Sequence, residues 1–256
     1  MKNLLLRTVV LGQICFLVLF FSSCKGKYIL KKKESTFQSI FNGKDLEGWH
    51  GDPKYWRVED GILIGEVTPK TILKQNSFII YQNVQPKNFE LMLEYRISSS
   101  GNSGINYRSE IIENKSFALR GYQCDIDGKN KYTGQNYEEK KRTTLAYMGE
   151  IVTIPEMPKD FSKFGLRQNV KKNCWQTRTI TETKTKLTPY IKSNDWNSIH
   201  LIVKEETMQH FVNGVLFSEV SDLDSINRAM KGYLGVQVHV GPPMKIEYRN
   251  IMLKQL

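Results

Sequence analysis

Polar side chains with planar hydrogen-bonding groups line one face of three predicted strands. They are Gln237 and His239 in residues 236–240 (VQVHV), Gln123, Asp125 and Asp127 in residues 121–127 (GYQCDID), and Asn106, Arg108 and Glu110 in residues 104–110 (GINYRSE). Alternate residues of a strand point to opposite faces, so the members of each set share a face. An ordinary solvent face carries Lys, Glu, Thr and Ser, whereas amide, imidazole and guanidinium groups make directional hydrogen bonds. The pattern predicts a polar floor that binds a hydroxyl-rich ligand.

His239 is the first candidate for moving a proton at such a floor. Histidine has the ordinary side-chain pKa closest to neutrality, which suits a general base or acid. The alternative is a histidine that packs and bonds a backbone carbonyl. His50 is a weaker candidate because it lies in a predicted turn, and His200 and His210 lack polar neighbours at alternate positions.

Arg108 is the candidate for holding two ligand oxygens at once, because a guanidinium donates in a bidentate way. The alternative is a salt bridge to Glu110 or Asp125 that supports the sheet. Glu110 shares the predicted face of Arg108 and is a further acidic candidate for a catalytic role. An amide offers both a donor and an acceptor, as a sugar hydroxyl does. The amide candidates for hydroxyl recognition are Gln123, Gln237 and Asn106.

Asp125 and Asp127 lie two residues apart on one predicted face. Two ionised carboxylates at close range disfavour one another, so one of them can serve as a base with a raised pKa. Alternatively, both can bind a divalent cation such as calcium through oxygen ligands. For Asp127 we favour a third interpretation, a strand-end carboxylate that caps the turn at Gly128.

Three further candidates lie outside these strands. Glu66 ends the predicted strand ILIGE and is a candidate for reaching the ligand, although an exposed strand end is an equal alternative. Tyr137 and Arg142 belong to residues 132–142 (YTGQNYEEKKR), where they can supply a stacking platform and a charge at the rim of the site. A loop packed on itself explains this segment equally well.

Short strands must position these residues, because helical periodicity is nearly absent. Strand patterns recur from Trp56 to Leu253 with turn residues between them, and Asn213-Gly214 predicts a two-residue hairpin. Such a series predicts an all-β sandwich of two antiparallel sheets. Only residues 222–230 (DLDSINRAM) have a helical pattern, and residues 150–193 are the least regular part, which we expect to form loops at a rim.

The first residues of the chain predict export and lipidation. Lys2 and Arg7 precede an apolar run that is short for a membrane span and ends in FSSC, which resembles a bacterial lipobox. We therefore expect residues 1–24 to be a lipoprotein signal, Cys24 to be lipidated, residues 25–36 to be a tether and residues 37–256 to be one domain. A transmembrane anchor, or a signal cleaved elsewhere, is the alternative. The lipid would tether the domain to the membrane without spanning it.

Charge and cysteine content exclude other classes of protein. The formal net charge of +11 comes from basic residues scattered along the chain, whereas a nucleic-acid-binding protein concentrates them on one element with stacking aromatics. We therefore expect no nucleic-acid partner. Zinc-type CxxC or His-Cys spacing does not occur. After removal of Cys15 and lipidation of Cys24, Cys124 and Cys174 remain, and they either pair or stay as buried thiols.

An ordered set of motifs resembles the 3-keto-disaccharide hydrolase domain family. The motifs are FNGKDLEGW at 41–49, WRVEDG at 56–61, GNSGI at 101–105, DWN at 195–197, NGV at 213–215 and GPPMKIEYRNI at 241–251. Each motif is weak alone, but the ordered set covers residues 37–256. The resemblance implies a concanavalin A-like sandwich (a jelly roll of two curved sheets) with a sugar cleft on one sheet. It also implies an exported bacterial protein that is lipid-anchored in the cell envelope and acts on a carbohydrate.

The same resemblance implies cleavage of glycosides that are already oxidised at C3. A ketone at C3 acidifies the C2 proton, so elimination of the C1 substituent and addition of water give net hydrolysis. This route needs a base, an electrophile and an acid. The catalytic candidates are His239, Asp125, Arg108 and Glu110. The resemblance fixes no cofactor, and a divalent cation such as calcium is an option. The alternatives are a conventional glycosidase with paired carboxylates and a carbohydrate-binding lipoprotein without turnover.

Overall fold

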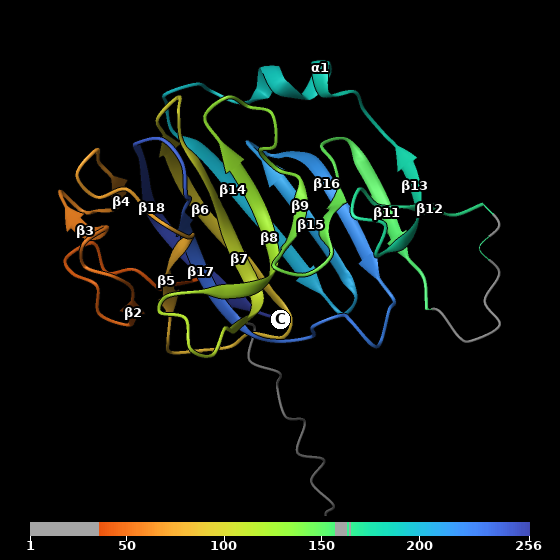
Figure 1. Ribbon diagram of the computed structural model, residues 1–256, viewed down its shortest axis with the longest axis horizontal. Helices are drawn as coiled ribbons and strands as arrows, with labels where there is room; N and C mark the ends of the chain where they lie inside the picture. Colours follow the sequence, from red (N-terminus) through yellow and green to blue (C-terminus); the bar gives the residue numbers. More distant parts are fainter. Residues whose placement is uncertain (1–35, 157–162, 164) are drawn as a thin grey trace, which may run out of the picture. The chain divides into compact units, whose positions relative to one another are not determined.

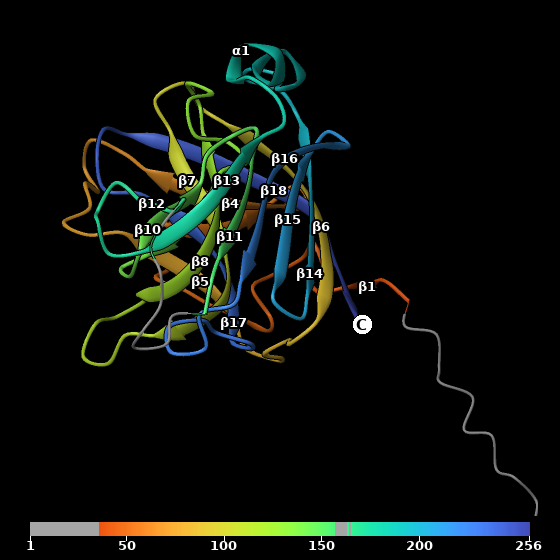
Figure 2. The ribbon, with the colours of Figure 1, turned by 90° about the vertical axis from the view of Figure 1, so that its right-hand side faces the viewer.

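The computed structural model describes residues 36–156, 163 and 165–256, and the predicted signal with Cys24 lies outside these residues. The described residues belong to one compact unit. Their strands form two sheets that pack face to face (Figures 1 and 2). Within this part of the chain, no helix is long and apolar enough to cross a membrane.

One sheet has seven strands among the described residues. They are β2 (Trp49–His50), β5 (Ser77–Tyr81), β7 (Asn102–Ile111), β8 (Leu119–Asp127), β9 (Asn136–Glu139), β10 (Thr143–Ala146) and β17 (Tyr233–Val238). Their spatial order is β10–β9–β8–β7–β17–β5–β2, so the three strands with predicted polar faces are neighbours at its centre.

The other sheet has eleven strands in the same part of the chain. They are β1 (Gln38–Ser39), β3 (Trp56–Glu59), β4 (Ile62–Val67), β6 (Phe89–Ile97), β11 (Glu150–Ile154), β12 (Arg167–Gln168), β13 (Trp175–Ile180), β14 (Asn197–Lys204), β15 (Thr207–Val212), β16 (Val215–Asp222) and β18 (Met244–Gln255). Figure 2 shows β7 and β8 in one layer and β14 and β15 in the other. A helical turn, α1 (Lys184–Leu187), precedes a 3₁₀ turn over Thr188–Tyr190.

Alternation of apolar residues builds the core between the sheets. In β6, Leu91, Leu93 and Tyr95 are buried while the intervening residues are more exposed. From the seven-stranded sheet, Cys124 and Val236 join the same apolar cluster. The residues next to them in sequence, Gln123 and Gln237 among them, therefore project from the opposite face of that sheet. Burial of the apolar face thus fixes where the polar face points.

The structure confirms the predicted all-β sandwich and corrects three details. β11 and β16 pair in parallel, whereas the other pairs of the two sheets are antiparallel. Residues 222–230 form no helix, and the described helical turns lie at residues 184–190 instead. The segment expected to be loops contributes β11, β12 and β13, and in β11 the alternate residues Glu150, Val152 and Ile154 are buried.

Candidate active site

A cavity of about 230 Å³ lies over the polar face of the seven-stranded sheet. It is lined by Asn102, Gln123, Asp125, Tyr132, Gln135, Tyr137, Glu139, Thr144, Gln237 and His239. Strands β7, β8 and β17 supply the floor, and β9 and β10 supply one wall. Strand register explains the grouping. Gln123 pairs with Asn106 on one side and Tyr137 on the other, and Asp125 pairs with Gly104.

Asp125 is a buried carboxyl group at this floor. The Nε2 group of Gln135 donates a hydrogen bond to its Oδ2 atom at 2.5 Å. Asp125 forms no ion pair within the described part of the chain. Burial raises the pKa of Asp125 well above its ordinary value, and the negative charges of Glu139 and Asp127 raise that pKa further. The hydrogen bond from Gln135 opposes this shift of the pKa. Asp125 therefore keeps its proton to a higher pH than an ordinary aspartic acid does, and in that form it can donate a proton.

Glu139 brings a second carboxyl group to the wall. Burial raises the pKa of Glu139, and Lys140, a hydrogen bond from Asn76 and the charge of His239 oppose that shift. The Nδ2 group of Asn76 lies 3.3 Å from Oε1 of Glu139. Tyr137 lines the same wall, where burial and the two carboxylates raise the pKa of its phenol to about 12. Tyr137 therefore keeps its proton as a hydrogen-bond donor at neutral pH.

His239 follows the last residue of β17 and faces the cavity beside Gln237. Its Nδ1 atom lies 2.5 Å from the carbonyl oxygen of Val240. A carbonyl only accepts, so Nδ1 carries a hydrogen, and in the neutral form of the ring Nε2 then holds the lone pair. The predicted alternative, a bond to a backbone carbonyl, is thus present together with a place in the cavity. This tautomer leaves His239 able to accept a proton through Nε2.

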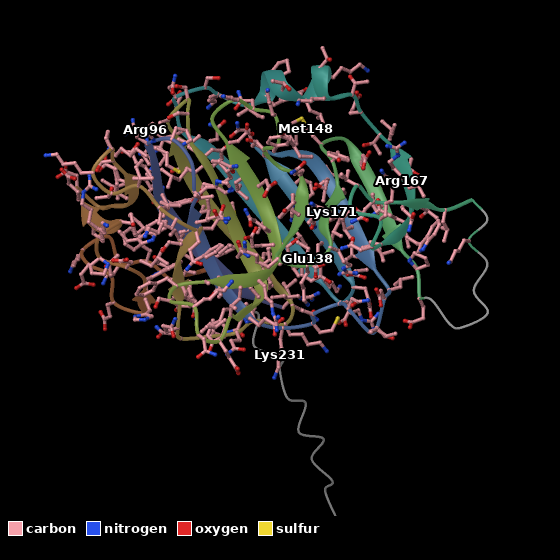
Figure 3. All side chains as sticks on the ribbon, in the orientation of Figure 1. Arg96, Glu138, Met148, Arg167, Lys171 and Lys231 are labelled. Carbon is pink, nitrogen blue, oxygen red and sulfur yellow. The ribbon has the colours of Figure 1, made fainter. Side chains whose placement is uncertain are left out.

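Alternate residues of β9 serve opposite faces of the sheet. Tyr137 and Glu139 line the cavity, whereas Asn136 and Glu138 are fully buried on the core side. Glu138 accepts hydrogen bonds from Arg142 Nε at 2.6 Å and from Arg142 Nη2 at 3.2 Å. The side chain of Glu138 lies inside the molecule, away from the peripheral Arg96 and Lys231 (Figure 3).

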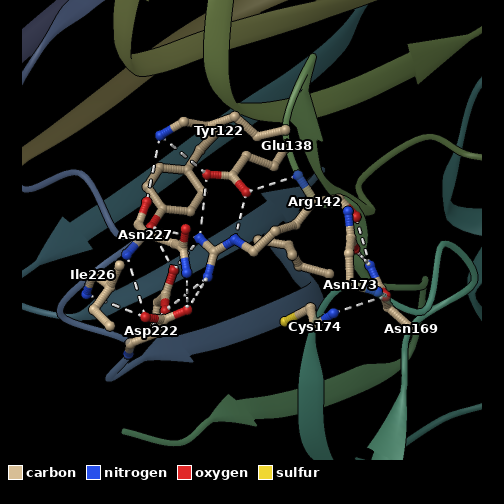
Figure 4. Close-up of polar contacts among 12 residues, drawn as sticks. Tyr122, Glu138, Arg142, Asn169, Asn173, Cys174, Asp222, Ile226 and Asn227 are labelled. Carbon is tan, nitrogen blue, oxygen red and sulfur yellow. Dashed lines mark hydrogen bonds and ion pairs between the residues drawn. The ribbon is translucent and has the colours of Figure 1, made fainter. Parts of the chain in front are cut away.

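Arg142 connects the two sheets through a buried ion cluster (Figure 4). Besides Glu138, its guanidinium contacts Asp222 at the end of β16, with Nη2 2.5 Å from Oδ2. The hydroxyl group of Tyr122 on β8 donates to the same Oδ2 atom at 2.5 Å. Because β16 belongs to the eleven-stranded sheet, the cluster fixes β9 against the opposite layer.

A second buried network lies under β9. The Nδ2 group of Asn136 donates to the Tyr107 hydroxyl at 3.0 Å, and that hydroxyl lies 2.8 Å from Nε2 of His210 on β15. Burial lowers the pKa of His210 to about 4, so its ring is neutral at physiological pH. The two networks bind Asn136 and Glu138, the core-facing polar residues of β9, which is the strand that also carries Tyr137 and Glu139.

The structure brings five predicted site residues together in the cavity: His239, Asp125, Gln123, Gln237 and Tyr137. Asn106 lies beside them in the sheet, fully buried, with its Nδ2 group 3.3 Å from Oγ of Ser109, although it does not line the cavity.

Arg108 and Glu110 do not reach the cavity, because β7 has a bulge between Tyr107 and Glu110. Arg108 takes a positive φ of 44°, and its guanidinium donates to the Lys87 carbonyl oxygen at 3.0 and 2.7 Å. Glu110 is exposed and pairs with Arg120 at 2.7 Å. The bulge ends the alternation on which the prediction depended.

Glu66 and Arg142 also lie away from the cavity. Glu66 is in β4 of the eleven-stranded sheet and pairs with Arg57 at 2.8 Å. Arg142 is held inside the molecule by Glu138 and Asp222, so it is no rim residue. Both side chains pair with charged residues of the protein itself.

Sequence reasoning missed five residues that line the cavity: Asn102, Tyr132, Gln135, Glu139 and Thr144. The spacing of Gln135, Tyr137 and Glu139 is the two-residue period of a strand face, and this signal was present in the sequence. It was hidden because Asn136 and Glu138 are polar too, so the segment resembles a loop.

The predicted cation site is not assembled in the described residues. Asp127 caps a turn instead: the backbone N–H groups of Tyr132 and Thr133 donate to its Oδ1 atom at 2.8 and 3.0 Å. This confirms the capping interpretation of Asp127. Within the described ranges, no group of three His, Cys, Asp or Glu side chains is arranged to hold a metal ion.

Solved structures share this fold. A structure from Parabacteroides distasonis, described as a proposed glycosyl hydrolase, covers 86% of this chain and 100% of its own with a TM-score of 0.53 and 17% identity. A carbohydrate-binding module, CBM66 of Bacillus subtilis, covers 81% of this chain and 96% of its own with a TM-score of 0.51 and 12% identity. A Bacillus subtilis protein with a galectin-like fold has a TM-score of 0.53, with 11% identity over 87% of this chain and 96% of its own. At such identities these likenesses establish the fold, a concanavalin A-like sandwich.

Sequence comparisons identify the family. A curated relative, the 3-keto-disaccharide hydrolase of Bacteroides thetaiotaomicron, is 26% identical over 144 residues, which is 49% of each chain. The chain thus spans about half the length of the curated relative that it matches. The family model of the 3-keto-alpha-glucoside-1,2-lyase-like domain matches residues 36–254, nearly all of the described domain. The chain therefore belongs to the family of 3-keto-alpha-glucoside-1,2-lyase-like domains.

Proposed function

We propose that this protein cleaves the glycosidic bond of 3-keto-glycosides by elimination followed by addition of water. The observation that carries the proposal is the presence of His239 and a buried, protonation-prone Asp125 in one cavity. An imidazole with a free lone pair and a neutral carboxylic acid are the base and the acid that this chemistry needs. The family match and the name of the curated relative support the choice of substrate.

In the first step, Nε2 of His239 takes the proton from C2 of the sugar. The electrons of that C–H bond form an enediolate, with the negative charge on the C3 oxygen. Tyr137, which keeps its phenol proton, is the donor available in the cavity for this oxyanion. The C3 carbonyl then re-forms, a C1=C2 double bond appears, and the bond from C1 to the leaving oxygen breaks.

Asp125 gives its proton to the leaving oxygen as that bond breaks. Water next adds across the C1=C2 bond: its hydroxyl goes to C1, its remaining proton returns to the Asp125 carboxylate, and C2 receives a proton from the His239 imidazolium, which has exchanged with solvent. The sum is one glycoside and one water converted to one 3-keto-sugar and one alcohol, so both side chains return to their starting states.

A second candidate function is conventional glycoside hydrolysis with two carboxyl groups. It is favoured by one observation, the presence of Asp125 and Glu139 in the same cavity. A conventional glycosidase needs no ketone at C3 and uses one carboxyl as acid and the other as nucleophile or base. The two functions therefore differ in the substrate that they accept.

The test uses the purified protein with a nitrophenyl 3-keto-glucoside and with its unoxidised parent in deuterated water. We expect nitrophenol release from the keto compound alone and one deuterium at C2 of the sugar product. Release from both compounds without deuterium at C2 would establish the conventional glycosidase. Release from neither compound would leave a carbohydrate-binding protein.

Matched variants assign the roles. His239→Gln and Asp125→Asn should each lower kcat by a factor on the order of 10² to 10⁴, the usual contribution of one acid or base. Glu110→Gln is the control, because Glu110 is an exposed carboxylate of the same sheet outside the cavity. We expect this control to keep wild-type activity.

A further inference from the structure

Two glutamine side chains at the cavity floor have polar atoms without partners. Gln123 on β8 and Gln237 on β17 are 3% and 0% exposed, and both line the cavity. Nε2 of Gln123 approaches Oε1 of Gln237 at 3.4 Å, a long hydrogen bond. Within the described residues, Oε1 of Gln123 and Nε2 of Gln237 have no hydrogen-bond partner. The two amides in contact therefore leave one free acceptor and one free donor.

Gly104 makes this approach possible. It lies on β7, the strand between β8 and β17, where it pairs with Asp125 and precedes Ile105, the partner of Val236. A Cβ atom added at Gly104 would lie only 1.9 Å from Nε2 of Gln123 and 2.5 Å from its Cδ atom. Any larger residue would therefore displace the Gln123 amide, which crosses the strand to reach Gln237.

We infer that Gln123 and Gln237 together bind one hydroxyl group of the sugar ring. A hydroxyl group donates one hydrogen bond and accepts others, so it satisfies the free oxygen of Gln123 and the free N–H of Gln237 at once. A buried polar atom without a partner is costly, and a ligand that supplies the partner removes that cost. The inference extends the proposed function by naming the group that orients the substrate.

This arrangement selects against a ketone at the same place. A carbonyl oxygen accepts from Gln237 but cannot donate to Gln123, whose oxygen would stay unsatisfied. A site built to bond a hydroxyl rejects an analogue that lacks it more strongly than an apolar pocket does. The amide pair therefore binds a ring position other than the oxidised C3 and so sets the orientation of the ring.

The experiment compares the 3-keto-glucoside with its 2-, 4- and 6-deoxy derivatives, by kcat/KM and by calorimetric affinity. We expect one derivative to lose about ten-fold or more with the wild-type protein, the size of one or two hydrogen bonds. With the Gln123→Met and Gln237→Met variants, the kcat/KM and the affinity of this derivative should equal those with the wild-type protein, because the hydroxyl and the amide act as a pair. Gln209→Met is the control, since Gln209 lies on β15 of the other sheet.

Thermal melting gives a readout that needs no ligand. If the amides serve a ligand, the Gln123→Met/Gln237→Met double variant should melt at or above the wild-type temperature, because it removes both unpartnered atoms together with the long hydrogen bond between the two amides. Gly104→Ala should cause the same loss of hydroxyl discrimination by displacing Gln123. A lower melting temperature for the double variant, or equal losses for every deoxy derivative in all variants, would overturn the inference. Cleavage of the keto-glucoside without coupling between one hydroxyl group and the two glutamines would reject this inference but not the proposed function. Coupling in the affinities without cleavage would reject the proposed reaction but not this inference.

Discussion

Glu138 and Glu139 are neighbours in β9, yet their carboxyl groups serve opposite faces of one sheet. Glu138 is fully buried on the core side, where it accepts hydrogen bonds from Arg142. Glu139 lines the cavity, where burial raises its pKa. The strand that carries Glu139 and Tyr137 is therefore held from beneath by buried ionic contacts. The four residues of β9 (Asn136–Glu139) therefore contribute both to the stability of the core and to the geometry of the cavity.

Arg142→Leu should destabilise the fold strongly. The substitution leaves the carboxylates of Glu138 and Asp222 buried without their cation, which typically costs about 3–5 kcal/mol of unfolding free energy. Urea unfolding followed by fluorescence measures the change. Arg57→Leu is the matched control, because Arg57 is 45% exposed where it pairs with Glu59 and Glu66. Exposed pairs contribute about 0–1 kcal/mol, so equal losses for the two variants would contradict the assigned role of Arg142.

Asp125→Asn should stabilise the protein, and the gain should grow with pH. The pKa of Asp125 is raised on folding, so the wild-type protein loses stability as pH rises from the ordinary value of about 4 toward the raised value. Asn imitates the protonated acid and escapes this loss, at a slope of up to about 1.4 kcal/mol per pH unit. Thermal melts between pH 4 and pH 8 measure the difference. A gap that stays constant or narrows toward high pH would show that Asp125 is ionised in the native state.

Glu139→Gln should move the alkaline limb of the activity profile to lower pH. The negative charge of Glu139 helps to raise the pKa of Asp125, so its removal lets Asp125 lose its proton at a lower pH. The readout is the pH dependence of kcat/KM for the 3-keto-glucoside. A uniform loss at every pH, without a shift of the limb, would mean that Glu139 acts on the substrate directly.

The sequence was sufficient to predict the sandwich and the floor of the site, because both follow from two-residue periodicity. Burial of Cys124 and Val236 forces Gln123, Asp125 and Gln237 to the other face. The same logic failed at Arg108, where a bulge breaks the alternation. A bulge is decided by long-range pairing and the available contacts, here the Lys87 carbonyl, and leaves no local pattern.

β9 shows a second limit of sequence reasoning. Its core-facing residues, Asn136 and Glu138, are polar, so the apolar period that marks a strand is missing. Their partners, His210 and Arg142, come from distant parts of the chain or from beyond the next turn. A polar residue is stable in the core only with such partners, and one sequence does not reveal which side chains meet.

Cys24→Ser should release the protein from membranes. We propose that Cys24 in the predicted lipobox is acylated, and acyl chains are the source of membrane affinity in a tethered protein. Cell fractionation and incorporation of an alkyne-labelled fatty acid measure the effect in a bacterial expression host. Ser23→Ala is the control, because a small residue before the cysteine is kept. Membrane retention of the Cys24→Ser protein would favour a transmembrane anchor instead.

Cys124 and Cys174 should be unreactive in the native protein and titrate as two free thiols after unfolding. Both are buried and unpaired, and burial raises the pKa of the Cys124 thiol and brings that of Cys174 to about 11. The thiolate is the reactive form, so a native protein at pH 8 should resist Ellman's reagent. The measurement uses a chain with Cys15→Ser and Cys24→Ser, before and after addition of guanidinium chloride. Absence of thiols in the unfolded sample would reveal a disulfide, and a rapid native reaction would mean that one of the two sites opens to solvent.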